Sequence, residues 1–231
     1  FPTVRAYDPA YAYETAVIVF DGLKRLYEDN ETAIYYITLE NENYEMPEMP
    51  AGCEEGIISG MYRVSTVASD GAKHRVQLFG SGAILRQTLK AQQLLAEKYG
   101  IGSDVWSVTS YTQLRREAQE CERLNMLYPN EPPRVPYVAH ALAGAEGPCI
   151  AASDYVRAVA EQISPWCPGG LFALGTDGMG RSESRETLRR HFEVDPEFIT
   201  LAALYQLKKH GKCDGQCVAK AVKELGIDPA K

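Results

Sequence analysis

The stretch Leu171-Phe-Ala-Leu-Gly-Thr-Asp-Gly-Met-Gly-Arg-Ser182 joins an apolar run to a glycine-rich loop, and a strongly polar segment follows it. The apolar run predicts a buried strand over residues 171–174, and the polar segment predicts a helix over residues 182–191. Backbone N–H groups at such a junction face outward and suit an anion. The glycine spacing matches neither the phosphate-loop nor the dinucleotide pattern. A plain turn and a ligand-binding loop therefore both remain open.

The same order of strand, loop and helix recurs before this junction. The predicted strands cover residues 75–80, 103–108 and 149–152, and the predicted helices cover residues 83–98, 111–126, 155–163, 196–210 and 214–225. Strands that alternate with helices imply an α/β fold with a mostly parallel sheet between two layers of helices. In such sheets, ligands bind beyond the carboxyl ends of the strands. This rule favours the loops at residues 80–82, 109–110, 153–154 and 175–182, although helix capping alone also explains their polar residues.

The first seventy residues follow a different pattern. Asp8 and Pro9 predict the N-cap and first position of a dense apolar helix that runs to Tyr27. A buried strand is predicted over residues 33–39 and a short strand over residues 60–64. The polar link at residues 68–74 predicts a domain boundary. We therefore expect one domain over residues 1–70 and a second over residues 71–231.

Composition excludes several classes of protein. The net charge is −7 and no basic run stands out, so we expect no nucleic-acid partner. No apolar stretch approaches the roughly 20 residues that a membrane span needs. The six scattered cysteines indicate reduced thiols and a cytoplasmic protein. His210, Cys213 and Cys217 lack a fourth ligand at standard spacing, so we expect no metal site.

Seven motifs occur in order along the chain and together carry a family resemblance. They are Tyr7-Asp-Pro-Ala-Tyr-Ala-Tyr-Glu14, Asn41-Glu-Asn-Tyr44 with Met46-Pro47, Leu78-Phe-Gly-Ser-Gly82, Asp104-Val-Trp-Ser-Val-Thr-Ser110, Glu122-Arg with Asn125-Met-Leu127, Pro133-Arg-Val-Pro-Tyr137 and Gly175-Thr-Asp-Gly-Met-Gly-Arg-Ser182. Together these motifs resemble the C-terminal part of the homodimeric bacterial pyruvate dehydrogenases, the thiamine-dependent first components of the pyruvate dehydrogenase complex. The resemblance covers essentially the whole chain.

The resemblance implies a transketolase C-terminal-like domain, preceded by the end of a pyrimidine-binding domain. It further implies a homodimer that decarboxylates pyruvate with thiamine diphosphate and magnesium. The acetyl group then passes to a lipoyl group of the dihydrolipoyl acetyltransferase component. The family places its cofactor-binding residues earlier in the longer protein. We therefore expect this chain to be an inactive C-terminal fragment that supports dimerisation and shapes the active-site entrance.

The resemblance also suggests site residues. Tyr7 matches a tyrosine that lines the thiamine site of relatives, and a core tyrosine is the alternative. Glu45 stands where relatives carry a histidine, and a carboxylate there would repel an anionic substrate. Both are candidate catalytic residues. Glu42, Asn43, Asp177 and Arg181 are expected at the substrate entrance.

A non-catalytic module that binds a partner is the alternative function. Its docking element would be the helix over residues 181–190, where Arg185 and Arg189 repel each other and would gain from an external anion. Glu186 and Arg190 form an attractive pair at the same spacing. A solvated helix face with mixed charges also explains this pattern. If the chain lacks part of its first domain, we expect exposed apolar side chains at Val17, Ile18, Phe20, Ile34 and Ile37, and self-association through them.

Overall fold

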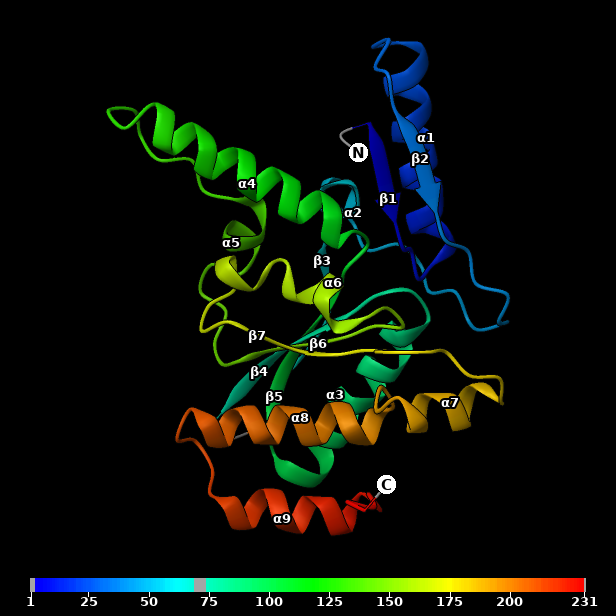
Figure 1. The fold of residues 1–231 in the computed structure, drawn as a ribbon, viewed down its shortest axis with the longest axis vertical. Coiled ribbons are helices and arrows are strands. Elements are labelled where there is room, and N and C mark those ends of the chain that lie inside the picture. Colours follow the sequence, from blue (N-terminus) through cyan, green and yellow to red (C-terminus); the bar gives the residue numbers. More distant parts are fainter. Residues whose placement is uncertain (1–2, 69–73, 231) are drawn as a thin grey trace.

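The computed structural model describes residues 3–68 and 74–230, which form two sheets with their helices (Figure 1). The strands are β1 Val4–Tyr7, β2 Ile34–Ile37, β3 Tyr62–Val67, β4 Arg75–Gly80, β5 Gly102–Ser107, β6 Cys149–Ala152 and β7 Leu171–Leu174. The helices are α1 Ala12–Tyr27, α2 Glu54–Ser59, α3 Leu85–Tyr99, α4 Tyr111–Leu127, α5 Tyr137–Ala141, α6 Arg157–Glu161, α7 Arg185–His191, α8 Pro196–Lys209 and α9 Gly215–Glu224. Two short 3-10 helices cover Gly82–Ile84 and Ser164–Trp166.

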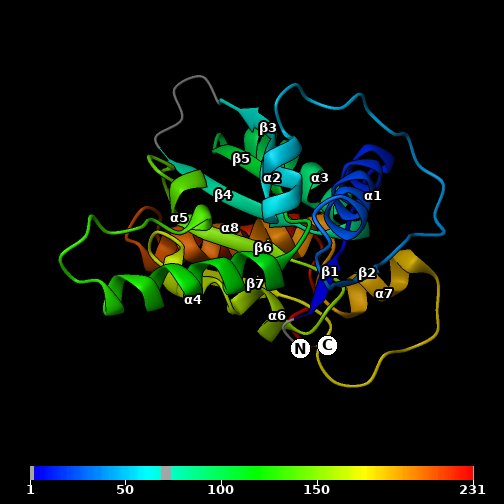
Figure 2. The same ribbon diagram turned by 90° about the horizontal axis from the view of Figure 1, so that it is seen from above.

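The larger sheet has the strand order β3-β5-β4-β6-β7, with β3 and β7 at opposite edges (Figure 2). Strands β5, β4, β6 and β7 are parallel to their neighbours, and β3 alone runs antiparallel, against β5. The predicted mostly parallel sheet is confirmed. The chain moves from β4 to one side for β5 and to the other side for β6. This reversal leaves a crevice between the loops that follow β4 and β6.

Helices cover both faces of this sheet. Val76 and Leu78 on β4 pack with α3 and α8, whereas Phe79 packs with α4 and α5 on the opposite face. This alternation follows from the two-residue period of a strand, which sends neighbouring side chains to opposite faces. Helix α9 lies outside α8 (Figure 1). The predicted three-layer α/β/α arrangement is confirmed.

The smaller sheet consists of β1 and β2, which are parallel, and α1 packs on one of its faces. Tyr7 and Tyr35 stack on the α1 side, with ring centroids 6.2 Å apart, and Ile18 is buried beside them. The prediction that Ile18 is exposed was therefore wrong. Val17 and Ile37 are half-buried against this core, whereas Phe20 and Ile34 are exposed.

Helix α1 begins later than the sequence predicts. Its first residue is Ala12 and its N-cap is Tyr11, so Asp8 and Pro9 lie before the helix. The prediction of Asp8 as the N-cap was wrong because its carboxylate accepts a hydrogen bond from the hydroxyl of Thr38, at the end of β2. At the start of α1, the Glu14 carboxylate instead accepts hydrogen bonds from the backbone N–H groups of Ala10 and Tyr11.

The buried carboxylate of Glu14 also connects the two sheets. The hydroxyl of Tyr62 on β3 donates to it at 2.6 Å, and the hydroxyl of Ser107 on β5 donates at 2.7 Å. Tyr13 extends the network, with its hydroxyl 2.6 Å from that of Tyr62. Burial raises the pKa of Glu14, while its four donors oppose the rise. A fully buried carboxyl with this many partners holds α1 in one position on the larger sheet.

Other helix boundaries also differ from the predictions. Helix α6 begins at Arg157 after Val156, so Ser153 and Asp154 do not cap it. Helices α2 and α5 were not predicted, because five or six residues are too few to show a helical period. Helix α9 starts as predicted, with the Asp214 carboxylate accepting from the Cys217 N–H at 2.8 Å.

The predicted domain boundary falls on the link at residues 68–74, of which residues 69–73 lie outside the described residues. Strand β3 precedes this link and pairs with β5, so the larger sheet begins before residue 70. Within the described ranges, every helix is too short or too polar to cross a membrane.

Candidate functional site

The carboxyl ends of both sheets meet at one place in the molecule. Asp8 follows β1, and its backbone N–H donates to the carbonyl of Thr109 beyond β5, at 2.7 Å. Its carbonyl accepts from the N–H of Gly82 beyond β4, at 3.2 Å. Its carboxylate accepts from Thr38 and, at 3.4 Å, from the hydroxyl of Tyr155 beyond β6. Asp8 thus contacts four of the loops that lie at the strand ends.

Gly82 is the residue that allows Asp8 to approach so closely. Its φ is +49°, and a Cβ there would lie 2.9 Å from each carboxylate oxygen of Asp8. Such a contact is too short for any real side chain, and the backbone conformation favours glycine. Steric crowding by Asp8 therefore explains why glycine occupies the last position of the motif Leu78-Phe-Gly-Ser-Gly82.

Three carboxylates lie around the crevice between β4 and β6. They belong to Asp8, Glu40 and Asp154, which come from the ends of β1, β2 and β6. Burial, followed by the charge of Glu40, raises the pKa of Asp154 to about 6. Burial also raises the pKa of Asp8 and of Glu40, and the charge of Asp8 adds to the effect on Glu40. This part of the site therefore favours protonated carboxyls at mildly acid pH.

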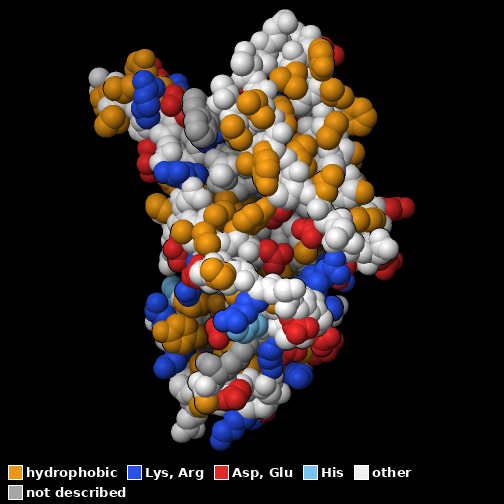
Figure 3. All heavy atoms as spheres, turned by 45° about the vertical axis from the view of Figure 1, so that its right-hand side comes forward, with side chains coloured by type: hydrophobic (Ala, Val, Ile, Leu, Met, Phe, Trp, Pro, Cys, Tyr) orange, Lys and Arg blue, Asp and Glu red, His pale blue; other side chains and the backbone are white. Residues whose placement is uncertain are grey.

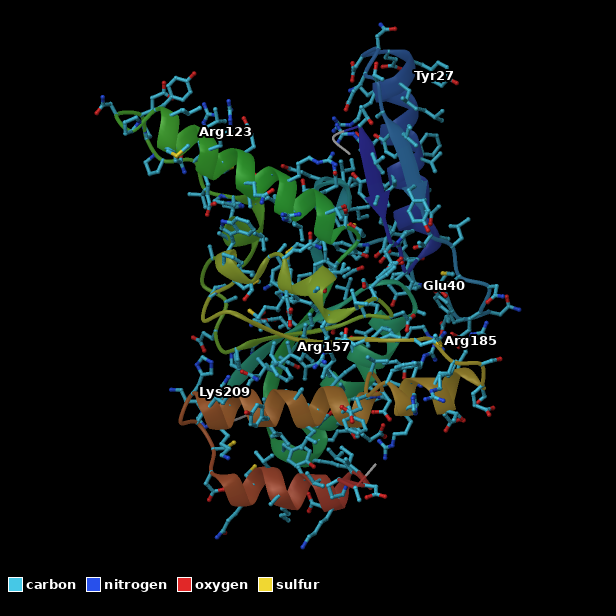
Figure 4. All side chains as sticks on the ribbon, viewed as in Figure 1. Tyr27, Glu40, Arg123, Arg157, Arg185 and Lys209 are labelled. Carbon is cyan, nitrogen blue, oxygen red and sulfur yellow. The ribbon has the colours of Figure 1, made fainter. Side chains whose placement is uncertain are left out.

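Three arginines surround the carboxylate of Glu42, and Figure 4 shows one of them, Arg185, on the same side of the molecule as Glu40. The Glu42 carboxylate lies 2.8 Å from Arg189, 3.3 Å from Arg86 and 3.8 Å from Arg185. Burial raises the pKa of Glu42, but the hydrogen bond and charge of Arg189 outweigh it, so the pKa lies below its usual value. Arg185 also donates to the Asn41 side chain at 2.6 Å. The anion expected to relieve the repulsion between Arg185 and Arg189 is thus the carboxylate of Glu42, within the same chain.

A cavity of about 300 Å³ separates the carboxylates from α7. It is lined by Glu40, Ala83, Asp154, Thr176, Gly180, Arg181, Arg185, Leu188, Arg189, Phe192 and Val194. Both signs of charge face it, together with the apolar side chains of α7 and the segment after it. The cavity can therefore accept a small polar or anionic molecule, oriented by arginines on one wall and carboxyls on the other.

The predicted site residues lie in different parts of this region. Arg181 lines the cavity, and Glu42 holds the arginines beside it. Asp177 accepts from the backbone N–H and the guanidinium of Arg157, at 3.0 Å and 2.5 Å. Asn43 and Glu45 are exposed on the loop after β2.

Tyr7 is buried, and its hydroxyl donates to the carbonyl of Ile58 at 2.9 Å. Burial, with the charge of Tyr35 next, raises the pKa of Tyr7 to about 12. The phenol therefore stays protonated at neutral pH, and its donor is used within the protein. Its side chain also borders a second cavity of about 180 Å³, between Asp8 and Tyr155. A catalytic role of Tyr7 stays a prediction.

Four residues of the site were missed by the sequence analysis. They are Asp8, Glu40, Arg86 and Arg189. Asp154, by contrast, lies in the loop at residues 153–154 that the strand-end rule favoured. Asp8 follows a parallel strand, a position that indicates a site, but it was interpreted only as a helix cap. The spacing of Arg185 and Arg189 indicated a need for an anion, but no local pattern connects them with Arg86, which is about a hundred residues away in the sequence.

Comparison with known proteins identifies the family. The model for the transketolase-like TK C-terminal domain matches residues 60–195, and the model for the pyruvate dehydrogenase E1 component middle domain matches residues 1–47. The pyruvate dehydrogenase E1 component of Escherichia coli (strain K12) is 52% identical over 232 residues, and that of Cupriavidus necator is 48% identical over 230 residues. The chain belongs to the pyruvate dehydrogenase E1 family. The alignments cover 100% of this chain and 26% of each of these two relatives.

Solved structures show that the fold of this E1-family chain is shared with transketolases. A transketolase from Leishmania mexicana superposes with a TM-score of 0.58 at 16% identity, over 90% of this chain and 26% of that one. A split-gene transketolase, described as an inactive beta4 tetramer, superposes with a TM-score of 0.55 at 15% identity. It matches over 90% of this chain and 59% of that one. At such low identity the likeness concerns the fold alone.

Among the described residues, no three histidine, cysteine, aspartate or glutamate side chains are grouped so that they could hold a metal ion. Cys213 and Cys217 are free thiols, and the Cys213 thiol lies 3.3 Å from the carbonyl of Leu204.

We expect Gly82→Ala to lower the free energy of unfolding by more than about 2 kcal/mol, because the new Cβ adds a clash with Asp8 to the strain of a positive φ. Gly144→Ala is the matched control, since its φ is +74° and nothing lies within 4 Å of an added Cβ. The control should lose about 1 kcal/mol. Urea unfolding measures both, and equal losses would show that the contact with Asp8 is unimportant.

We expect Asp154→Asn to make stability less dependent on pH. The folded protein binds this proton more tightly than the unfolded chain, so the stabilising contribution of Asp154 is complete below about pH 4 and is lost as the pH rises through about 6. The Asp154 carboxyl is crowded by protein atoms, but its side chain still contacts solvent, which screens the effect. The variant should therefore be more stable than the wild type by only about 1 kcal/mol near pH 7.5. The two proteins should be equally stable near pH 4.

Unfolding in urea across this pH range measures the effect of the substitution. Asp29→Asn provides the control, because Asp29 is exposed and its carboxylate makes no hydrogen bond or ion pair with any described residue. A difference between the wild type and Asp154→Asn that stays constant with pH would contradict the prediction.

Proposed function

We propose that this chain is the C-terminal part of a thiamine-diphosphate-dependent pyruvate dehydrogenase, the E1 component that decarboxylates pyruvate. The observation that carries the proposal is the 52% identity to the E. coli E1 component over the whole chain. We further propose that the acetyl group passes to a lipoyl group of a dihydrolipoyl acetyltransferase. Thiamine diphosphate and magnesium would bind to the part of the protein that precedes these residues.

The role of the described residues in this reaction is to shape the entrance to the active site. The loop after β2 carries Glu42, Asn43 and Glu45, and Arg185 and Arg189 hold this loop through Glu42 and Asn41. The loop after β7 is held separately, through Asp177 and Arg157. Both loops border the charged cavity, which gives an anionic substrate a defined approach. Tyr7 and Glu45 remain the candidate catalytic residues of this chain.

The test is a chimera of the E. coli E1 component in which this chain replaces the matching C-terminal segment. With thiamine diphosphate, magnesium and pyruvate, the chimera should release carbon dioxide and acetylate a lipoyl domain, as detected by mass spectrometry. The chain of 231 residues alone should do neither, because it spans only 26% of that relative.

The controls are the E. coli protein with its own C-terminal segment and the same protein without it. A folded chimera without activity, together with a 231-residue chain that binds a partner, would favour the non-catalytic assembly module. Turnover by the chain alone would contradict our placement of the cofactor.

We also propose that the protein is a homodimer. Figure 3 shows apolar side chains gathered over the upper part of the molecule, where α1 and β2 lie. Phe20 and Tyr27 on α1 are 72% and 78% exposed, and Ile34 and Tyr36 on β2 are 64% and 62% exposed. Phe20 and Tyr27 lie on the side of α1 turned away from the small sheet, whereas Ile34 and Tyr36 lie on the sheet face opposite α1. Monomeric proteins rarely leave so many large apolar side chains in water, so these two faces favour association.

We expect the chain to sediment as a dimer or larger species, and Phe20→Asn combined with Tyr27→Asn to weaken the association by at least about tenfold, since each change removes much of the apolar area. Met179→Asn is the control, because Met179 is even more exposed, at 89%, but lies on the loop after β7. Analytical ultracentrifugation measures all three. A wild-type monomer at high concentration would overturn this proposal.

A further inference from the structure

Another hollow, separate from the two cavities described above, lies at the amino ends of the strands of the larger sheet. Its volume is about 430 Å³, which is within the range of small-molecule sites. It is lined by His74, Arg75, Ala145, Glu146, Gly147, Pro148, Pro168, Gly169, Leu207, His210 and Lys212. Figure 4 labels Lys209 at the end of α8 nearest this hollow, on the opposite side of the molecule from Glu40 and Arg185.

Basic side chains dominate the lining. His74 and Arg75 come from the start of β4, and His210 and Lys212 come from the turn after α8. Glu146 is the single acid among the lining residues. The two basic segments are more than a hundred residues apart, so the fold brings them together. In a chain with a net charge of −7, such a concentration of basic groups is unusual.

Most of these basic groups have no protein partner. The guanidinium of Arg75 is already paired with Asp104, at 3.0 Å. For His74, His210 and Lys212, no side-chain hydrogen bond or ion pair joins them to another described residue. Donors that face a concave space without an acceptor are available to an external anion.

The walls give the hollow a defined shape. Ala145 and Pro168 supply an apolar surface beside the basic groups, whereas Pro148 and Leu207 are buried. The Cε1 atom of His210 would lie 3.3 Å from a Cβ at Gly169, so the imidazole lies close over the bare backbone of that glycine. At Gly147, a Cβ would lie 1.8 Å from the carbonyl oxygen of Arg75. The loop before β6 is thus packed directly on the backbone of β4, and this close packing fixes one side of the hollow.

We propose that this hollow is a binding site for a small phosphate monoester. The phosphate would accept hydrogen bonds from His74, His210 and Lys212, and the organic group would lie against the apolar surface of Ala145 and Pro168. Phosphate suits this lining because it accepts from several donors at once. The apolar wall contributes to binding only if the anion carries an organic group that can pack against it. The site is independent of the proposed pyruvate dehydrogenase function.

The test measures the binding of phenyl phosphate and of inorganic phosphate by isothermal titration calorimetry, using the complete chain. Both should bind saturably at one site, with phenyl phosphate at least about tenfold tighter because its ring covers the apolar wall. The double variant His210→Gln with Lys212→Met should weaken both probes by at least about tenfold, since it removes two donors.

Lys209→Met is the matched control, because Lys209 lies at the same end of α8, near the ring of Tyr205, and does not line the hollow. Its affinity for both probes should be that of the wild type. The proposal is overturned if neither probe binds saturably, or if the control weakens binding as much as the double variant. Equal affinities for the two probes would overturn the role of the apolar wall. Thermal unfolding verifies that each variant is folded.

Discussion

The buried carboxyl of Glu14 is the constraint on which the arrangement of the two sheets depends. Burying a carboxyl costs several kcal/mol unless it is hydrogen-bonded. Here the donors come from Tyr62, Ser107 and the backbone of Ala10 and Tyr11. Two of these donors belong to the larger sheet. Any displacement of α1 would therefore leave a buried polar group without a partner.

This constraint places the end of β1 at the site. With α1 fixed, the segment before it carries Asp8 into the crevice between β4 and β6, where Gly82 leaves the space that its carboxylate needs. The crevice then combines the carboxyl ends of two sheets instead of one. Burial, and after it mutual repulsion, raises the pKa of the carboxyls there, whereas the arginines around Glu42 lower the pKa of Glu42. Opposite charges are thus separated across one cavity.

The two ends of the larger sheet differ in how their charges are satisfied. At the carboxyl end, Arg185 and Arg189 find Glu42 and Asn41 within the chain, so the surface of α7 is tied to the loop after β2. At the amino end, His210 and Lys212 face a hollow without such a partner. Charge that a protein satisfies internally stabilises a loop, whereas charge left unsatisfied in a concave space suits a ligand.

The sequence alone predicted the elements whose signals are local. The strand at Leu171–Leu174, the start of the last helix at Asp214 and the alternation of strands with helices were all predicted, as were the fold class and the family. Helix α2 was missed because it is too short to show a period, and the start of α1 was wrong because Thr38 binds the side chain expected to cap it. Of the site, Glu42 and Arg181 were predicted from the resemblance.

Contacts between distant residues were decided only by the tertiary structure. Glu42 meets Arg189 across 147 positions, and Asp8 meets Tyr155 across the same number. No spacing along the chain predicts such contacts, because they depend on how the two sheets pack. The sequence by itself therefore determined the order of elements, the fold class and the family. The tertiary structure decided which charges face one another, because electrostatic and hydrogen-bonding partners depend on distance in space.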